Sequence, residues 1–347
     1  PPPPPPTPAQ ACVAVGETVA AGQRIGVADG DVSADVHSPC AGRVLAVAPR
    51  ALARFPGLEA VHVSLETSAA PPPQRLAPMD WQASDPTALR ERLAAAGLVG
   101  LGGAGFPTAG KLSVARDLLV LNGAECEPWI ACDDALLREH ADDVVRGGRL
   151  LARMVGASRV LLAIEDTMIQ ALAAARAATA SQGDGAVEVV AVPTVYPQGG
   201  ERQLIQVLTG QEVPRGRLPR DIGVIVQNVA TARAAWLAVT QGEALVSRVV
   251  TVTGPGVAQP GNFVVPLGTS VAHVVAQAGG YTEAAVRLVL GGPMMGQALP
   301  HDDFPLGKQD NCVLVLSAEA GTHPEPRKPS IPSGASPRPS PAPQQAP

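Results

Sequence analysis

The sequence has few aromatic residues and no long apolar segment. Aromatic side chains make up 3% of the 347 residues, against 46% apolar residues, so a large core must be built from Ala, Val and Leu. No apolar run reaches the roughly 18 residues of a membrane-spanning helix, and no signal-peptide pattern stands near the start. Acidic side chains outnumber basic ones, 31 to 26, which argues against a nucleic-acid partner. We expect an α/β protein with no transmembrane segment of its own.

Cysteine is also scarce and irregularly spaced. Five cysteines do not form a disulfide scaffold, and the absence of a Cys-x-x-Cys pair excludes the usual iron–sulfur ligand spacing. The six histidines likewise lack the spacing of metal ligands, so no metal site is expected. We expect the cysteines to be small buried apolar residues: Cys12, Cys40, Cys126, Cys132 and Cys312.

Proline is concentrated at the two ends of the chain. Sixteen of the 36 prolines lie either among the first eight residues or between Pro324 and Pro347. Proline lacks the N–H group and fixes φ, so segments this rich in it form neither helix nor sheet. We expect residues 1–11 to be a disordered Pro-rich segment and residues 319–347 to be a disordered Pro/Ser tail.

Residues 12–70 are predicted to form a small β module. Short alternating apolar runs are separated by Gly, Asp-Gly and Pro turns, a pattern typical of a small barrel or sandwich. The stretch VAVGETVAAGQRIGVADGDVSADVHSPCAGRV resembles the lipoyl- and biotinyl-carrier fold. Such carriers attach their cofactor to a lysine at a hairpin tip, whereas the tip here reads Ala28-Asp29-Gly30-Asp31. We therefore predict a lipoyl-like barrel-sandwich module without carrier chemistry.

A linker at 71–84 leads into residues 85–245, where strand and helix patterns alternate. Asp85 and Pro86 mark the start of the first helix, and Gly97 marks its end. Strands are predicted at 118–121, 159–164, 187–192 and 223–226, and helices at 134–155, 166–179, 201–208 and 230–239. This alternation predicts a mainly parallel sheet with covered faces.

Residues 246–318 change character again. Two strand patterns flank a Pro/Gly turn, and Thr269 is expected to cap a short helix that ends at Gly279-Gly280. The stretch resembles the soluble-ligand-binding β-grasp module, and a final strand pattern follows it.

The most informative segment is the glycine-rich loop 100–105, with Lys111 shortly after it. Four glycines in six positions allow the backbone to approach a ligand closely and to present several N–H groups to an anion. The spacing fits neither a dinucleotide fingerprint nor a P-loop. Only three of the 26 basic residues are lysines, so a lysine at this place suggests a phosphate partner. A plain connecting loop and a solvated surface lysine are the alternatives.

Polar loops follow several of the predicted central strands. In open α/β sheets, ligands bind outside the carboxyl ends of the strands. A single acidic turn at 122–128 would not by itself indicate a binding site, but similar polar loops follow several strands along the chain. They carry donors and acceptors suited to ribose, ring and phosphate groups: Asn122, Glu125, Glu127, Glu201, Asn228 and Thr231.

Together these motifs resemble one known family. The set GLVGLGGAGFPTAGKL, LNGAECEPWIACDD, YPQGGERQL, QNVATA and GGPMMGQAL closely resembles the C subunit of the Rnf electron-transport complex. That complex is the membrane ferredoxin:NAD oxidoreductase also called Rsx. The first four motifs are also similar to those of the flavoprotein subunit of respiratory complex I. The resemblance covers about residues 12–316 and has the three modules in the family's order.

The resemblance implies a site for FMN and a site for NAD(H) as substrate. By position, FMN would be held by Gly100, Gly102, Gly103, Lys111, Asn122, Glu125, Asn228 and Thr231. The nicotinamide nucleotide would face Phe106, Glu127 and Glu201. No catalytic acid or base is implied, because FMN supplies the redox chemistry.

The chain also departs from the family pattern. Complex I has acidic residues at the positions of Ala124 and Gly200, so nucleotide contacts there are expected to differ. The family carries two 4Fe-4S clusters on Cys-x-x-Cys-x-x-Cys-x-x-x-Cys-Pro repeats after the final strand, and these motifs are absent from this chain.

We therefore predict an FMN-binding, NAD(H)-reactive subunit of an ion-translocating ferredoxin:NAD electron-transport complex. It would lie peripherally on the cytoplasmic side of the bacterial inner membrane. Its partners would be the other Rnf/Rsx subunits and a ferredoxin or another iron–sulfur electron carrier. The alternatives are a non-catalytic truncated scaffold subunit and a soluble diaphorase-like flavoenzyme.

Overall fold

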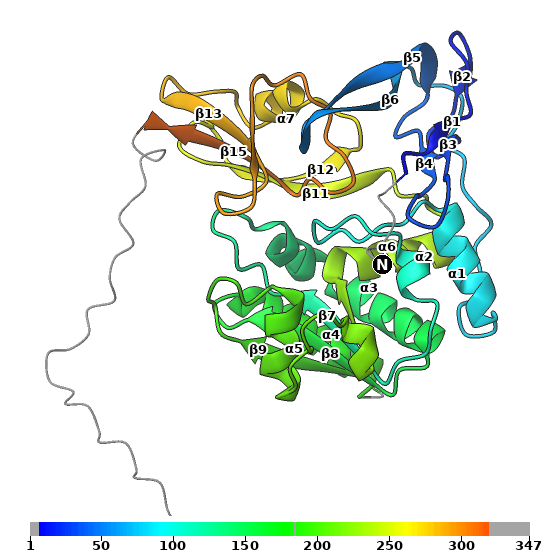
Figure 1. The fold of residues 1–347 in the computed structure, drawn as a ribbon, viewed down its shortest axis with the longest axis vertical. Coiled ribbons are helices and arrows are strands. Elements are labelled where there is room, and N and C mark those ends of the chain that lie inside the picture. The colour runs from blue at the N-terminus through cyan, green and yellow to red at the C-terminus, as the bar shows by residue number, and fades with distance from the viewer. Residues whose placement is uncertain (1–6, 184, 319–347) are drawn as a thin grey trace, which may run out of the picture.

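The computed structural model describes residues 7–183 and 185–318, which form three parts in the expected order (Figure 1). The central α/β domain forms the lower half of the molecule in Figure 1, and the two β-rich modules lie together above it. The expectations for residues 1–6 and 319–347 fall outside the described residues.

The N-terminal module consists of two three-stranded antiparallel sheets, in the orders β1-β3-β4 and β2-β5-β6. Its strands are β1 (Gln10–Ala11), β2 (Thr18–Val19), β3 (Arg24–Val27), β4 (Val36–His37), β5 (Gly42–Leu52) and β6 (Phe55–Thr67). Val19, Ile25 and Val44 form its small core. Gln10 and Ala11 were expected to be disordered, but they pair with β3, because the polyproline run ends before them.

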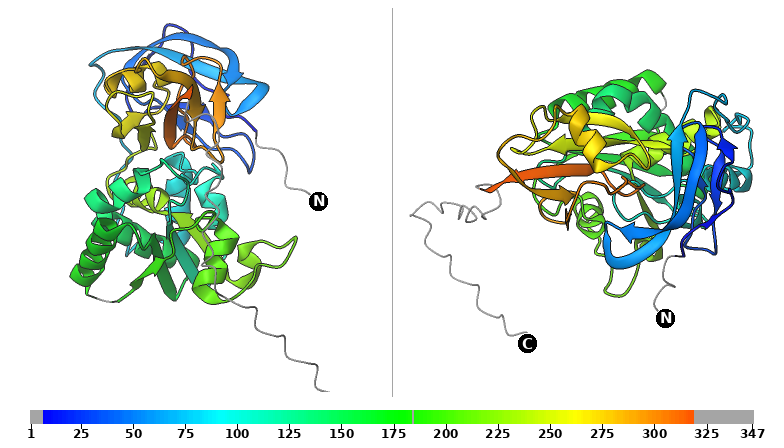
Figure 2. Two further views of the ribbon diagram at one scale, coloured as in Figure 1. Left: turned by 90° about the vertical axis from the view of Figure 1, so that its left-hand side faces the viewer. Right: turned by 90° about the horizontal axis from the view of Figure 1, so that it is seen from above.

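The β5–β6 hairpin is the largest element that the sequence did not predict. It extends well beyond the module and lies beside the C-terminal module (Figure 2). Ala53, at its turn, packs against the core of the C-terminal module. The alternation of Val61, Val63 and Leu65 is typical of a strand and provides the sequence signal for β6.

The central domain is built on a four-stranded, fully parallel sheet in the order β10-β7-β8-β9. The strands are β7 (Leu118–Gly123), β8 (Arg159–Glu165), β9 (Val187–Val192) and β10 (Val224–Asn228). β8 is buried over nearly its whole length, as is usual for a parallel strand with helices on both faces. The predicted parallel sheet is therefore confirmed.

Helices cover both faces of this sheet. One face packs against α3 (Cys132–Val155), α4 (Ile169–Gln182) and α6 (Val229–Thr240), and α1 (Pro86–Ala95) packs on α3 and α6. The other face packs against α5 (Glu201–Thr209), through Leu204 and Ile205. Two short helical turns, α2 (Thr108–Lys111) and η1 (Pro219–Ile222), lie in the connections.

Helix boundaries follow local capping chemistry. α1 begins as predicted, since Asp85 Oδ1 accepts the Thr87 N–H at 2.7 Å and Pro86 occupies the first turn. α4 begins at Ile169 instead of the predicted residue 166. The carboxylate of Asp166 instead accepts hydrogen bonds from the N–H and hydroxyl of Thr194, which holds it in the preceding turn.

The C-terminal module is a five-stranded mixed sheet, in the order β12-β11-β15-β13-β14, with one helix packed on its core. Its elements are β11 (Ser247–Thr253), β12 (Gly261–Pro266), α7 (Val271–Gln277), β13 (Ala285–Leu290), β14 (Gln297–Leu299) and β15 (Cys312–Ser317). Ser270, and not the expected Thr269, caps α7, because the Thr269 hydroxyl donates to the Pro266 carbonyl. The β-grasp assignment stays a prediction.

None of the helices in the described residues is both long and apolar enough to cross a membrane.

Candidate functional site

The candidate site lies at the carboxyl edge of the parallel sheet, between β7 and β10. From β7 the chain proceeds outward through β8 and β9, and then returns to place β10 on the other side of β7. Strand order therefore reverses between these two strands, which is where open α/β sheets bind ligands. Asn122 and Asn228, the polar residues at the two strand ends, are register partners.

The glycine-rich loop 100–105 is closed on itself and anchored to α6. The Gly100 N–H donates to the Phe106 carbonyl at 2.8 Å, and the Gly105 N–H donates to the Gly100 carbonyl at 3.1 Å. The Leu101 N–H donates to the Thr231 hydroxyl at 2.9 Å, and Thr231 is fully buried. The loop is thus a constrained element and not a loose connection.

The same loop has the form of an anion cradle. Within the described residues, the N–H groups of Gly102, Gly103 and Ala104 donate to no protein acceptor. Gly103 has φ +102°, and a Cβ at this position would meet nothing within 4 Å. Adjacent N–H groups that have no protein acceptor can bind an oxyanion.

Lys111 and Glu201 come together beside this loop. Lys111 Nζ lies 2.8 Å from Glu201 Oε1 and donates to the Val226 carbonyl of β10 at 2.6 Å. The Lys111 side chain is 36% exposed, and its ammonium is held by these two contacts.

The two strand-end asparagines organise the surrounding loops. Asn228 Oδ1 accepts the Ala230 N–H and caps α6, while its Nδ2 donates to Asp133 Oδ2 at 2.6 Å. Asn122 Oδ1 accepts the Ala124 N–H, and its Nδ2 donates to the Gly199 carbonyl at 2.9 Å. Each asparagine therefore fixes its own loop and a neighbouring segment.

Glu125 caps α3 from outside the helix. Its carboxylate accepts the N–H groups of Asp133 and Asp134 at 3.1–3.2 Å, and Cys132 Sγ donates to it at 3.0 Å. Glu125 and Asp133 keep some accessible surface, but protein atoms surround their carboxyl groups. Burial, and then the charge of Asp133, raises the pKa of Glu125 to about 8; burial raises the pKa of Asp133 to about 6.

Glu127 contacts the C-terminal module. Its Oε1 accepts the N–H groups of Met294 and Met295 at 2.8 and 2.7 Å. The side chains of these two methionines are 54% and 73% exposed. Phe106, also predicted for the nucleotide side, is 42% exposed.

The cysteines do not assemble a cluster. Cys132 and Cys312 are buried as expected, but Cys40 and Cys126 are only half-buried and Cys12 is exposed. Among the described residues, one group of three candidate metal ligands lies within 4.8 Å: Glu125, Cys132 and Asp133. It contains one thiol, which does not match the ligands of an iron–sulfur cluster.

Sequence patterns did not identify several residues of the site. Asp133 was visible only as part of the motif LNGAECEPWIACDD. Arg248 stands in a strand far along the chain, yet it donates to the Leu101 carbonyl at 3.1 Å. The sequence also did not reveal three side chains that each have a buried polar atom without a protein hydrogen-bond partner: Glu165, Gln198 and Gln227.

Family models match the chain in three consecutive stretches. Residues 6–68 match the RnfC barrel sandwich hybrid domain, residues 93–236 match the Nuo51 FMN-binding domain, and residues 249–298 match the SLBB domain. Residues 100–105, Lys111 and both strand-end asparagines fall inside the second match.

Two curated relatives are both named as the C subunit of an ion-translocating oxidoreductase complex. The protein from Pseudomonas aeruginosa is 44% identical over 332 residues, which are 94% of this chain and 42% of that protein. The protein from Rhodobacter capsulatus is 41% identical over 310 residues, which are 87% of this chain and 59% of that protein. Over most of its length the chain is therefore similar to the C subunits of ion-translocating oxidoreductase complexes. It spans about half the length of these two relatives.

A solved structure supports the same fold. A chain of an NAD+-reducing NiFe hydrogenase in the air-oxidized state is 28% identical, with a TM-score of 0.59. The match covers 68% of this chain and 47% of the hydrogenase chain. The family resemblance and the α/β fold with an N-terminal barrel-sandwich domain, expected from the sequence, are thus confirmed.

Proposed function

We propose that this chain binds FMN at the carboxyl edge of its central sheet and exchanges a hydride between NAD(H) and the flavin. The observation that carries the proposal is the set of N–H groups at 102–104 without a protein acceptor, in a loop that packs against Asn228 at the topological switch point. The match of residues 93–236 to an FMN-binding domain supports the choice of ligand.

The residues present fit the phosphate end of FMN. Three N–H groups without a protein acceptor can bind the phosphate, the Lys111 ammonium can add a charge-assisted contact, and Gly103 leaves the space that a side chain would fill. Gly100 and Thr231 keep this loop in place, through the Phe106 carbonyl and the Leu101 N–H. Gly102 packs against Asn228 and brings the loop next to the end of β10.

Other residues would orient the ring and the nucleotide. Asn122 and Asn228 present fixed side chains at the ends of the two adjacent strands, and Glu125 fixes the start of α3. Phe106, Glu127 and Glu201 are assigned to the nicotinamide side of the site. Bound FMN would supply the conversion between two-electron and one-electron transfer.

The wider role is also proposed from the relatives. The protein would work in an ion-translocating oxidoreductase complex, with the other Rnf-type subunits and a ferredoxin or similar iron–sulfur carrier as partners. It would be peripheral, on the cytoplasmic side of the membrane. No 4Fe-4S cluster is assigned to the five cysteines of this chain.

Reconstitution tests the proposal. Purified chain is titrated with FMN, and flavin fluorescence and absorbance are followed; NADH is then added without oxygen. We expect saturable binding at micromolar FMN and bleaching of the flavin absorbance by NADH. A folded protein that binds no FMN overturns the whole proposal. If FMN binds but NADH does not bleach it, the hydride-exchange part of the proposal is wrong and the chain is a flavin-binding scaffold.

A further inference from the structure

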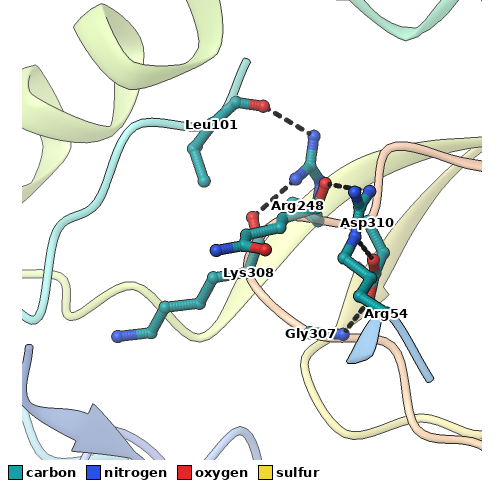
Figure 3. Close-up of polar contacts among 7 residues, drawn as sticks. Arg54, Leu101, Arg248, Gly307, Lys308 and Asp310 are labelled. Atoms are coloured by element: carbon teal, nitrogen blue, oxygen red, sulfur yellow. Dashed lines mark hydrogen bonds and ion pairs between the residues drawn. The ribbon is translucent and has the colours of Figure 1, made fainter. Parts of the chain in front are cut away.

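We propose that Arg248, from the C-terminal module, is a positioning residue for the cofactor loop at 100–105. The inference rests on the proposed FMN site and adds that the central domain does not form this site alone. Its starting point is a buried arginine whose hydrogen bonds end on main-chain carbonyls of two different segments (Figure 3).

Arg248 reaches from β11 to the start of the glycine-rich segment. Its Nη2 donates to the Leu101 carbonyl at 3.1 Å, and its Nη1 donates to the Lys308 carbonyl at 2.6 Å. Arg248 is 6% exposed. The Leu101 N–H is already bound to Thr231, so both polar groups of Leu101 are fixed immediately before the free N–H array.

A second contact holds the other end of the same loop. Gln309 packs against Gly105 so closely that a Cβ on Gly105 would lie 1.9 Å from Gln309 Nε2. Gln309 belongs to the segment 307–310, which is closed by a hydrogen bond from the Gly307 N–H to Asp310 Oδ2 at 2.7 Å. Arg248 thus contacts the cofactor loop at Leu101, and the 307–310 segment contacts it at Gly105.

The 307–310 segment is in turn fixed by the other two parts of the chain. Lys308 Nζ donates to the Asp35 carbonyl at 2.6 Å and to the Gly97 carbonyl at 2.7 Å. Arg54, from the β5–β6 hairpin, donates to Asp310 Oδ1 at 2.6 Å and to the Gln309 carbonyl at 3.0 Å (Figure 3). All three parts therefore contribute to holding one loop.

This arrangement provides preorganisation. Glycines lose much backbone freedom on ordering, so a loop that is ordered only when FMN binds would lower the affinity. Removal of the Arg248 guanidinium also takes its donor from the buried Leu101 carbonyl and from the half-buried Lys308 carbonyl. The expected defect is a disordered cofactor loop in a protein that is otherwise folded.

The experiment compares Arg248→Gln and Arg248→Lys with the control Arg153→Gln. Arg153 is a matched control because it also donates to two main-chain carbonyls, those of Trp81 and Ser84, but not to the cofactor loop. We expect Arg248→Gln to weaken FMN binding at least about tenfold, with partial recovery in Arg248→Lys, which keeps a charged donor. Arg153→Gln should bind FMN as the wild type does.

Hydrogen exchange provides the second measurement and needs no FMN. In the flavin-free protein, Arg248→Gln should speed exchange of the hydrogen-bonded loop amides of Gly100, Leu101 and Gly105, while amides of β7 and β8 exchange at wild-type rates. Unchanged exchange in the loop, or unchanged FMN affinity in a wild type that binds FMN, overturns the inference. A wild type that binds no FMN overturns the proposed function, and the exchange result still decides the role of Arg248.

If Arg248→Gln does not fold, a second variant tests the inference. Arg54→Gln removes the support of the 307–310 segment from the hairpin, where the arginine is 25% exposed. Arg54→Gln should also weaken FMN binding and speed amide exchange in the loop, but less than Arg248→Gln does. Wild-type loop exchange in Arg54→Gln, when Arg248→Gln does not fold, would also count against the inference.

Discussion

The Lys111 ammonium lies 2.8 Å from the Glu201 carboxylate, so residues assigned by family resemblance to two different ligands are each other's partner. Both side chains are partly exposed, at 36% and 39%, and an ion pair of this kind contributes little stability. An incoming phosphate can therefore replace the carboxylate at low cost. Under the proposed assignments, the pair would link occupation of the flavin side to the state of the nicotinamide side.

Replacing Lys111 by Ala tests the phosphate assignment. The substitution should lower FMN affinity about tenfold, since it removes one charge-assisted contact. Riboflavin, which lacks the phosphate, should bind the variant and the wild type equally. Fluorescence titration with both flavins measures the difference, and an equal loss for both flavins would place Lys111 away from the phosphate.

Replacing Glu201 by Gln should have the opposite effect on FMN. Without the carboxylate, Lys111 has no charged competitor, so FMN affinity should rise a few-fold. The Michaelis constant for NADH should rise in the same variant if Glu201 contacts the nucleotide. Glu212→Gln, in the loop that follows α5, is the control for loss of one negative charge. Weaker FMN binding in Glu201→Gln would contradict the competition.

Gly103→Ala tests the anion cradle. At φ +102° a side chain costs about 1–2 kcal/mol of backbone strain, and the added methyl group would occupy the open space. The control is Gly156→Ala, at φ +66° after α3, where a Cβ also meets nothing. Both variants should lose similar thermal stability, but only Gly103→Ala should lose FMN affinity. Equal FMN binding would exclude the loop as the phosphate site.

Glu125→Gln should change how stability depends on pH. The pKa of Glu125 is raised to about 8 in the folded chain, mainly by burial, so the folded protein binds its proton more tightly than the unfolded chain does. The resulting stability is complete below about pH 4.5 and is lost as pH rises through 8. The wild type should therefore lose stability relative to the variant over this range, by up to about 1.4 kcal/mol per pH unit.

Denaturant unfolding at several pH values measures this difference. Glu139→Gln, on an exposed position of the same helix, controls for removal of a charge. A stability difference between Glu125→Gln and wild type that is constant with pH would show that the Glu125 carboxyl does not titrate in this way.

The parallel sheet could be predicted because each strand is short, apolar and followed by a helix pattern. Residues 159–164 and 187–192 differ from β8 and β9 by one residue at most, since such strands end where polar loops begin. The β5–β6 hairpin was missed because its strands carry many exposed residues and lack a clear apolar face for most of their length. Tertiary contacts with the C-terminal module support it instead.

Candidate site residues could be predicted where they lie within one contiguous sequence motif. The glycines, Lys111 and the strand-end asparagines lie in contiguous motifs, and the fold brings them to one edge of the sheet. Arg248 and Lys308 could not be found in this way. Their hydrogen bonds join segments more than a hundred residues apart, and no local pattern encodes such contacts.

The junction around Lys308 also bears on how the chain is made. Lys308 contacts Asp35, 273 residues earlier, and Arg54 contacts the segment that follows Lys308. During synthesis, both the barrel-sandwich module and the parallel sheet emerge long before residue 308. The loop at 100–105 therefore lacks this support until residues 307–310 have emerged, and contacts of such long sequence separation form slowly. We expect ordering of this loop to follow the formation of the domain that contains it.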